Sequence, residues 1–190
     1  MTKSELRKEY KKRRNNLSIQ DQATLNDQLF EKLRMLDWEK YTYVHVYLTL
    51  EKFNEPDTSQ LIKWLREFHP HIQLVISKSN FTNGSMQNYI LNDKTELIEN
   101  AYGILEPVKG ELVDEILIDL AFVPLLVIDI KGNRVGYGKG FYDRFLSKCR
   151  PDIKSYGISF FEPVQCISDV DEWDRRLTHC ITPLNIYSFQ

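Results

Sequence analysis

The feature that most restricts the fold of this chain is an uninterrupted apolar stretch at residues 120–128. A strand with one face in water alternates apolar and polar residues, whereas a strand buried on both faces is apolar throughout. Sheets are buried on both faces when helices cover them, as in parallel sheets. The stretch therefore predicts a central strand of a parallel sheet. We expect this strand to end or bulge at Pro124, because proline cannot donate a ladder hydrogen bond.

Helical and extended patterns alternate along the rest of the chain. Apolar spacing and turn signals predict helices over residues 4–14, over a segment carrying Leu25, Leu29, Leu33 and Leu36, after Asp57 or Thr58, and over 139–149. Runs of β-branched and aromatic residues predict strands at 43–50, 71–78, 86–91, 156–160 and 180–182. Ser18 and Asp21 form a capping-box pattern before the second helix. This order predicts a three-layer α/β/α fold with a mostly parallel central sheet.

Length, charge and residue usage exclude several classes of protein. A chain of 190 residues without repeats or Gly/Ser linkers predicts one domain over 1–190. The formal net charge of −2 gives no overall positive field, so we expect no nucleic-acid partner. No apolar stretch is long enough to cross a bilayer, and the basic amino terminus lacks the apolar core of a secretory signal. We therefore expect no membrane association and a cytoplasmic location.

Cysteine and histidine residues suggest no metal site. The three cysteines, Cys149, Cys166 and Cys180, are far apart and form no CxxC pair, which favours a reducing compartment. The four histidines form no familiar ligand motif. The segment His69-Pro70-His71 favours the start of a strand over a pair of metal ligands.

The candidate functional segment follows the apolar stretch directly. Gly132, Gly136, Gly138 and Gly140 fall within nine residues, immediately before a predicted helix. In a parallel sheet this position lies at the carboxyl ends of the strands, where α/β proteins bind ligands. Glycine lets backbone N–H groups approach a phosphate, and a helix amino terminus adds partial positive charge. The segment predicts an anion site, although a solvated glycine-rich turn with basic residues fits the same composition.

The glycine spacing differs from two familiar phosphate motifs. A P-loop requires GxxxxGK[ST], and here Gly138-Lys139 is followed by Gly140. A dinucleotide fingerprint requires GxGxxG, whereas the last three glycines occupy alternate positions. The composition thus indicates a phosphate-binding segment, but the glycine spacing does not show how the phosphate would be bound.

The segment VPLLVIDIKGNRVGYGKGFYDRFL resembles the signature of the 5-formyltetrahydrofolate cyclo-ligase family, also called methenyltetrahydrofolate synthetases. Shorter elements of the family pattern follow the same order. They are Lys3 with Arg7, Glu55 with Thr58, YGILEP at residues 102–107, and Asp174. The resemblance covers nearly the whole chain.

The resemblance implies an ATP site built from two segments. These are Lys3, Ser4, Glu5, Leu6 and Arg7, and then Arg134, Val135, Gly136, Tyr137, Gly138, Lys139, Gly140, Phe141 and Tyr142. Lys139 and Arg134 would act on the phosphates as catalytic residues. The remaining amino-terminal bases are expected to form a solvated face that steers anionic substrates. They are Lys8, Lys11, Lys12, Arg13 and Arg14.

The resemblance also implies a metal site and a folate site. Asp143 and Asp174 would hold Mg²⁺, which commonly takes one or two carboxylates together with phosphate oxygens. Leu50 would contact the folate through its apolar side chain, and Glu55 would accept hydrogen bonds from it. Residues 137–141 (Tyr137, Gly138, Lys139, Gly140 and Phe141) would contact both substrates.

The implied reaction is the ATP- and Mg²⁺-dependent closure of 5-formyltetrahydrofolate to 5,10-methenyltetrahydrofolate, with release of ADP and phosphate. An iminium phosphate is the implied intermediate. The folate could carry a polyglutamate tail, and a monomer and a homodimer both fit. A non-catalytic nucleotide- or folate-binding module of the same fold is the main alternative. A single-stranded nucleic-acid binder is disfavoured by the near-zero net charge.

Overall fold

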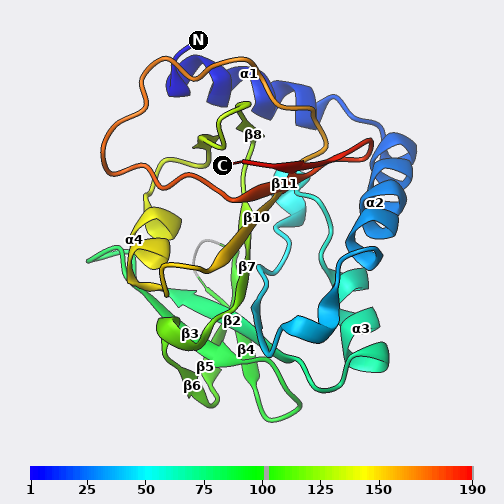
Figure 1. The fold of residues 1–190 in the computed structure, drawn as a ribbon, viewed down its shortest axis with the longest axis vertical. Coiled ribbons are helices and arrows are strands. Elements are labelled where there is room, and N and C mark those ends of the chain that lie inside the picture. The colour runs from blue at the N-terminus through cyan, green and yellow to red at the C-terminus, as the bar shows by residue number, and fades with distance from the viewer. Residues whose placement is uncertain (101–102, 190) are drawn as a thin grey trace.

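The computed structural model describes residues 1–100 and 103–189, and a large mixed sheet forms its centre. The strands of this sheet are β1 (Tyr43–His45), β2 (Gln73–Ser79), β3 (Met86–Ile90), β6 (Leu112–Val113), β7 (Leu120–Pro124), β10 (Lys154–Ile158), β11 (His179–Ile181) and β12 (Ile186–Ser188). Their order is β12-β11-β10-β7-β1-β2-β3-β6 (Figure 1). The five strands from β11 to β2 run parallel, and β12, β3 and β6 join antiparallel at the two edges.

Helices and two short hairpins complete the described fold. The α-helices are α1 (Lys3–Asn15), α2 (Ile19–Arg34), α3 (Ser59–Phe68) and α4 (Phe141–Lys148). Single 3₁₀ turns are η1 (Trp38–Lys40), η2 (Glu51–Phe53) and η3 (Glu115–Leu117). The hairpins pair β4 (Glu96–Glu99) with β5 (Leu105–Lys109), and β8 (Val127–Ile128) with β9 (Arg134–Val135).

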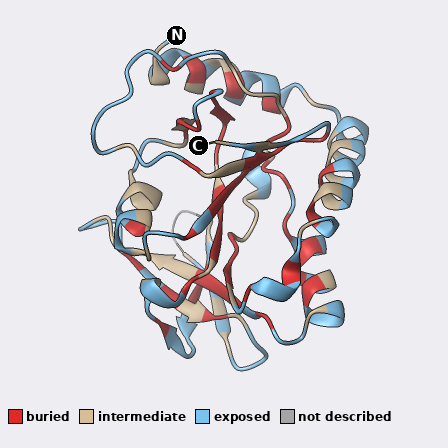
Figure 2. Cartoon of the chain, viewed as in Figure 1, coloured by how far each residue is buried: buried red, intermediate tan, exposed pale blue. Residues whose placement is uncertain are grey.

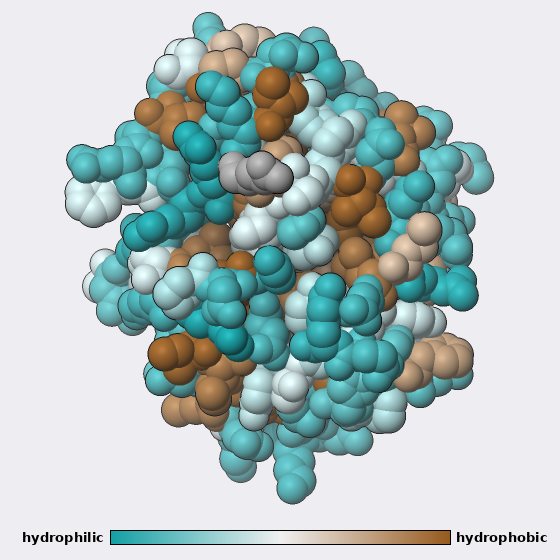
Figure 3. Space-filling model, in the orientation of Figure 1, coloured by the Kyte–Doolittle hydropathy of each residue, from teal (hydrophilic) through white to brown (hydrophobic). Residues whose placement is uncertain are grey.

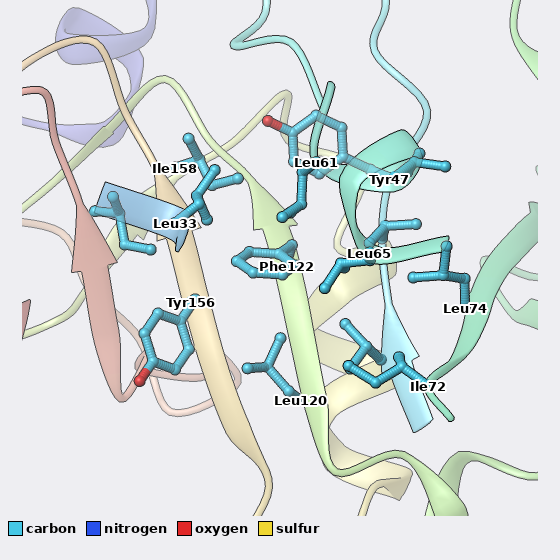
Figure 4. Packing of buried hydrophobic residues seen from close by; sticks show 14 of the residues in the cluster. Leu33, Tyr47, Leu61, Leu65, Ile72, Leu74, Leu120, Phe122, Tyr156 and Ile158 are labelled. Carbon is cyan, nitrogen blue, oxygen red and sulfur yellow. The ribbon is translucent and has the colours of Figure 1, made fainter. Parts of the chain in front are cut away.

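The central strand β7 is buried on both faces, as the apolar stretch predicts. Leu120 and Phe122 pack with the cluster that contains the apolar residues of α2 and α3. Ala121 packs with Phe145 of α4 in a second cluster. Figure 2 shows buried residues running along the central strands, and Figure 4 shows Phe122 in the middle of the first cluster. Helices thus cover both faces, and the α/β fold with a mostly parallel central sheet is confirmed.

Two of the expected strands are shorter than the sequence pattern. The apolar stretch is divided, because β7 ends at Pro124 and the chain leaves the sheet before β8 begins. The strand expected at 43–50 ends at His45. Beyond it, the hydroxyl groups of Tyr47 and Thr49 both donate to the carbonyl oxygen of Pro56, at 3.0 and 3.3 Å. These bonds hold residues 47–49 against the turn before α3 rather than along β2.

Helix ends agree with the sequence signals to within a few residues. The Ser18–Asp21 capping box is present at the start of α2, which ends at Arg34 and so leaves Leu36 outside. The helix expected from residue 139 begins at Phe141, because Gly140 adopts a left-handed conformation with φ 67°. The short strands β4, β5, β6, β9 and β12 were not expected, since each has mixed polarity and only two to five residues.

The remaining expectations concern membrane spans, the surface, the cysteines and the YGILEP element. None of the helices in the described parts of the chain combines the length and apolarity needed to cross a membrane. On the face shown in Figure 3, hydrophilic side chains predominate and hydrophobic ones gather in separate patches. Cys149, Cys166 and Cys180 are all free thiols. Tyr102, the first residue of the YGILEP element, lies outside the described residues.

Candidate active site

A large cavity opens at the carboxyl ends of strands β1, β2 and β7. Its volume is about 1080 Å³, at the upper limit of the roughly 300–1,000 Å³ usual for one small ligand. Its walls come from α1, the segment after β1, the end of β2, the glycine-rich loop and residues 171–175. This edge of a parallel sheet is where α/β proteins bind ligands. The size and position suit two ligands that lie side by side.

Most residues expected from the sequence line this cavity. They are Lys3, Arg7, Leu50, Glu55, Arg134, Gly136, Tyr137, Gly138, Lys139, Gly140, Phe141, Tyr142, Asp143 and Asp174. Ser4, Glu5, Leu6 and Val135 are not among the lining residues. Glu5 instead closes the capping box of α1 with Thr2, and the side chains of Leu6 and Val135 pack together in a buried cluster.

A buried aspartate shapes the start of the glycine-rich loop. Asp129 is fully buried, and its carboxylate accepts hydrogen bonds from the backbone N–H groups of Lys131 and Asn133, both at 2.9 Å. These bonds close the turn between β8 and β9. Beyond β9, Gly138 and Gly140 have φ values of 88° and 67°. This left-handed region favours glycine, because other residues are strained there.

The loop lies directly against α1. Nε of Arg7 donates to the carbonyl oxygen of Gly136 at 2.9 Å. A Cβ atom at Gly138 would stand 3.3 Å from Cζ of Arg7, closer than ordinary contact. The arginine therefore occupies space that only a glycine leaves open, and it links the two segments expected to hold ATP.

Lys3 and Asp174 meet at the cavity wall although 171 positions separate them. Nζ of Lys3 lies 2.7 Å from Asp174 and 2.9 Å from Asp171. Partial burial by itself lowers the pKa of Lys3, but the hydrogen bonds from Asp174 and Asp171 outweigh it and raise that pKa. These aspartates therefore hold an ammonium group beside the cavity.

Arg134 and Asp143 form a second ion pair, with Nη2 and Oδ1 at 2.7 Å. The same Oδ1 accepts the backbone N–H of Arg175 at 3.0 Å, and Arg134 also donates to the carbonyl oxygen of Arg175. Burial lowers the pKa of Arg134 and Asp143 opposes that shift. Asp143 lies in the first turn of α4, and its bond to Arg175 joins this helix to residues 171–175 of the cavity wall.

Lys139 differs from these cations because it is exposed and unpaired. Its ammonium group has neither a hydrogen bond nor an ion pair with any residue in the described ranges 1–100 and 103–189. It immediately precedes Gly140, the N-cap of α4, which has no side chain to satisfy the first helical N–H groups. A free ammonium group and open amide donors at one helix start make a favourable position for an anion.

The cavity wall also contains a buried carboxylate. Glu55 is 6% exposed and accepts hydrogen bonds from the Leu50 backbone N–H at 2.8 Å and the Tyr137 hydroxyl at 2.7 Å. Burial raises the pKa of Glu55, while these two hydrogen bonds act against the rise. The Tyr137 ring lies 5.0 Å from that of Phe53, at an angle of 32°. A flat aromatic ligand with N–H donors would match this combination of rings and carboxylate.

The burial of Arg14 differs from what the sequence pattern predicts. We expected it on a solvated basic face, but it is fully buried. It donates to the Tyr137 hydroxyl at 3.1 Å and to the carbonyl oxygen of Leu125. Arg14, Tyr137 and Glu55 therefore form one hydrogen-bonded chain. The only sequence signal was its place four residues after Tyr10, which is buried on the same side of α1.

Comparison with known proteins shows the family. A family model described as the 5-formyltetrahydrofolate cyclo-ligase family matches residues 1–183. This chain belongs to that family. Membership identifies a cyclo-ligase, an enzyme of one-carbon folate metabolism, and the family implies folate and ATP as substrates.

Two relatives illustrate the extent of the match to the cyclo-ligase family. The 5-formyltetrahydrofolate cyclo-ligase of Mus musculus is 27% identical over 184 residues, which covers 90% of this chain and 89% of the mouse protein. The protein of the same name from Escherichia coli K12 is 26% identical over 185 residues, which covers 94% of this chain and 99% of the relative.

Solved structures support the same relationship. The NMR structure of 5,10-methenyltetrahydrofolate synthetase from Aquifex aeolicus has a TM-score of 0.84 and 28% identity, and the match covers 100% of this chain and 94% of that one. A synthetase from Mycoplasma pneumoniae shares the fold, with a TM-score of 0.77, 21% identity, and coverage of 96% and 99%.

Proposed function

We propose that this cyclo-ligase closes 5-formyltetrahydrofolate to 5,10-methenyltetrahydrofolate in the cavity described above, with ATP as the phosphoryl donor. The observation that carries the proposal is the division of one cavity into a cationic part and a part with a buried carboxylate. The glycine-rich loop contributes to both, since it supplies the ammonium group of Lys139 to the first and the Tyr137 hydroxyl, bonded to Glu55, to the second. Two substrates bound there would meet at the loop.

The triphosphate of ATP would lie between α1 and the start of α4. Arg7 is already fixed against the loop through Gly136, and Lys139 has its ammonium group available. Backbone N–H groups at the start of α4 add further donors. Phosphoryl transfer depends mainly on positioning and neutralisation of charge, which these groups supply. We propose Lys139 and Arg134 as the cations nearest the transferred group.

A magnesium ion fits the carboxylates at the same end of the cavity. Asp143 and Asp174 both line the cavity, and carboxylate oxygens are the ligands that Mg²⁺ prefers. Each pairs with a cation, Asp143 with Arg134 and Asp174 with Lys3. We propose that these two aspartates hold the ion. When bound, Mg²⁺ would neutralise part of the phosphate charge.

The pterin ring of the folate would lie against Phe53 and Tyr137, with its N–H groups on Glu55. Tyr137 and Arg14 support this role. The hydrogen bond from the Tyr137 hydroxyl and the positive charge of Arg14 both favour the charged form of Glu55, whereas burial favours its neutral form. We propose Glu55 as the main anchor of the folate, Leu50 as an apolar contact, and Arg14 as a positioning residue that acts through Tyr137. Lys11, an exposed residue that lines the cavity, would attract a polyglutamate tail.

The chemistry follows from the poor leaving ability of the formyl oxygen. That oxygen attacks the γ-phosphorus of ATP, the bond from this phosphorus to the β,γ-bridging oxygen breaks, and ADP leaves. The resulting iminium phosphate carries a good leaving group on carbon. The N10 amine attacks that carbon, phosphate departs with the C–O bond electrons, and N10 loses its proton. We propose that this occurs in the cytoplasm, where the three free thiols would stay reduced.

The test is the stoichiometry of the purified protein. We expect one ADP for each methenyltetrahydrofolate, which is measured by its near-ultraviolet absorbance, and no turnover without added Mg²⁺. Rapid ATP hydrolysis in the absence of folate would contradict the coupled reaction. Binding of both substrates without any product would favour the non-catalytic alternative.

A further inference from the structure

A second cluster of side chains that can bind a metal lies at the amino ends of the central strands. Glu39 belongs to η1, His69 caps the carboxyl end of α3, and His71 stands two residues before β2. Each offers one ligand atom, and the three atoms lie within 4.8 Å of one another. Because η1 precedes β1 and His71 precedes β2, the cluster is at the amino ends of strands whose carboxyl ends border the cavity.

His69 is held in place by aromatic neighbours. Its ring centroid lies 4.8 Å from that of Trp64 and 6.3 Å from that of Trp38. Only 16% of the His69 side chain is exposed. Its Nδ1 atom is buried and has no hydrogen-bond partner within the described residues. A buried polar atom of this kind is costly unless something binds it.

Oε1 of Glu39 lies 3.2 Å from Nδ1 of His69. This contact has the distance of an ion pair without the geometry of a hydrogen bond. In a tetrahedral zinc site with bonds of about 2.0–2.1 Å, neighbouring ligand atoms are separated by about 3.3 Å. The two atoms already stand at that spacing. His71 is exposed and close, with its ring centroid 5.9 Å from that of His69, so a side-chain rotation would bring in a third ligand.

We propose that Glu39, His69 and His71 bind a divalent transition-metal ion, with water as the fourth ligand. Two imidazoles and one carboxylate suit Zn²⁺ and its neighbours in the first transition series, whereas Mg²⁺ and Ca²⁺ prefer oxygen ligands. The site is therefore chemically distinct from the pair Asp143 and Asp174. It would tie η1 to the turn between α3 and β2, so its effect is on stability rather than on ring closure.

The experiment is a calorimetric titration of Zn²⁺ into chelator-treated protein. The protein carries Cys166→Ser to remove the exposed thiol, and excess Mg²⁺ occupies the carboxylates of the cavity. We expect one ion per chain and a higher melting temperature in its presence, with the kcat of ring closure unchanged. Co²⁺ in place of Zn²⁺ should give the intense visible absorption of a tetrahedral site.

Two variants and a matched control assign the ligands. His71→Ala and Glu39→Gln should each weaken Zn²⁺ binding at least about tenfold, because even groups that only support a ligand change affinity by about 10–100-fold. Glu31→Gln removes an exposed carboxylate of α2 and should leave binding unchanged. Saturable binding that survives His71→Ala, or no saturable binding to the parent protein, would overturn the proposal. In the second case Glu39 and His69 would form only an ion pair.

Discussion

At the scale of single residues, the cavity contains two kinds of charged group. The Glu55 carboxylate is held by hydrogen bonds, whereas the Lys139 ammonium group has no partner among the described residues. Glu55 depends on Tyr137, and Tyr137 in turn depends on Arg14, so a side chain that never touches the ligand influences one that would. Lys139 has no such partner, and its position depends only on the backbone of the glycine-rich loop. Substitutions at these positions should therefore change different kinetic constants.

Tyr137→Phe should raise the KM for the folate about tenfold, because a hydrogen bond to a charged group contributes about 1.5–3 kcal/mol. The hydroxyl also lowers the pKa of Glu55, which burial raises. Its loss raises that pKa further, and a larger fraction of Glu55 is then protonated as pH falls. The increase in KM should therefore be greater at about pH 6 than at about pH 8. Steady-state kinetics across this range measures both effects.

Phe53→Leu is the matched control for the ring contact of Tyr137. Phe53 stacks on that ring without a hydrogen bond to Glu55. Its variant should raise KM equally at both pH values. A Tyr137→Phe variant with the same pH-independent increase would show that the hydroxyl does not act through the charge of Glu55.

Lys139→Ala should lower kcat by about a hundredfold, the usual result of removing one group that stabilises developing charge. Lys139 is exposed, and exposed substitutions usually change stability by less than about 0.5 kcal/mol. Lys131→Ala removes an exposed lysine outside the cavity and serves as the control. Equal kcat values for the two folded variants would mean that Lys139 is only a solvated side chain.

Asp143→Asn should shift the Mg²⁺ activation curve to higher concentration by about tenfold or more, since the site depends on anionic oxygen. Stability should also fall, because Arg134 would lose its ion pair. The activation curve is thus the deciding measurement. Asp152→Asn also breaks an arginine ion pair, but on the surface outside the cavity, and should leave the curve in place. An Asp143→Asn variant that only melts earlier would contradict a role in metal binding.

At the scale of elements, the glycine-rich loop works because its backbone is placed against α1. Gly138→Ala introduces a Cβ where φ is 88° and Arg7 is 3.3 Å away. A non-glycine residue in the left-handed region costs about 1–2 kcal/mol, and Arg7 must also move. We expect a higher KM for ATP and a lower melting temperature.

Gly136→Ala is a close control for this element. Its φ is not positive, and the nearest atom to an added Cβ is the Pro124 carbonyl oxygen at 4.0 Å. This variant should keep the parent melting temperature. If both alanine variants behave alike, the conformation of Gly138 is not what positions the ATP-binding segment.

At the scale of the whole molecule, stability should depend on one histidine in the core. His45 is fully buried between β1 and α4, with its ring 4.9 Å from that of Phe145. Burial lowers the pKa of His45 to about 4, from 6.5 in the unfolded chain. The folded state therefore favours the neutral ring, and its contribution is fully present above pH 6.5. It is lost as pH falls from 6.5 towards 4, by about 3 kcal/mol in total.

Urea unfolding at several pH values measures this effect. His45→Gln removes the titrating ring but keeps a polar group near the Ser77 hydroxyl, to which Nε2 lies at 2.9 Å. The variant will be less stable at pH 7, but its stability should decline less between pH 6.5 and 4.5. Parallel declines in both proteins would show that other groups govern the acid sensitivity.

The sequence alone determined the features that rest on local pattern. The apolar stretch at 120–128 predicted a strand covered on both faces, because apolar side chains on both sides of a strand require two layers of helices. The glycine cluster predicted a loop at the carboxyl ends of the parallel strands, because a segment that directly follows a strand begins at the carboxyl end of that strand. Most of the residues that the family pattern named line the cavity.

Only the tertiary structure decided how distant segments pair. The burial of Arg14 and the contact of Lys3 with Asp174 depend on groups 123 and 171 positions away in the chain. The end of β1 at His45 depends on the hydrogen bonds of Tyr47 and Thr49 to Pro56, which the apolar pattern does not indicate. An arginine on a basic helix looks solvated until the fold supplies a hydroxyl and a carbonyl oxygen to receive it. His69 and His71 likewise lack a spacing that indicates metal, because their third partner, Glu39, is brought in by a turn thirty positions earlier. Periodicity records which face of an element is buried, but it carries no information about which polar atoms meet there.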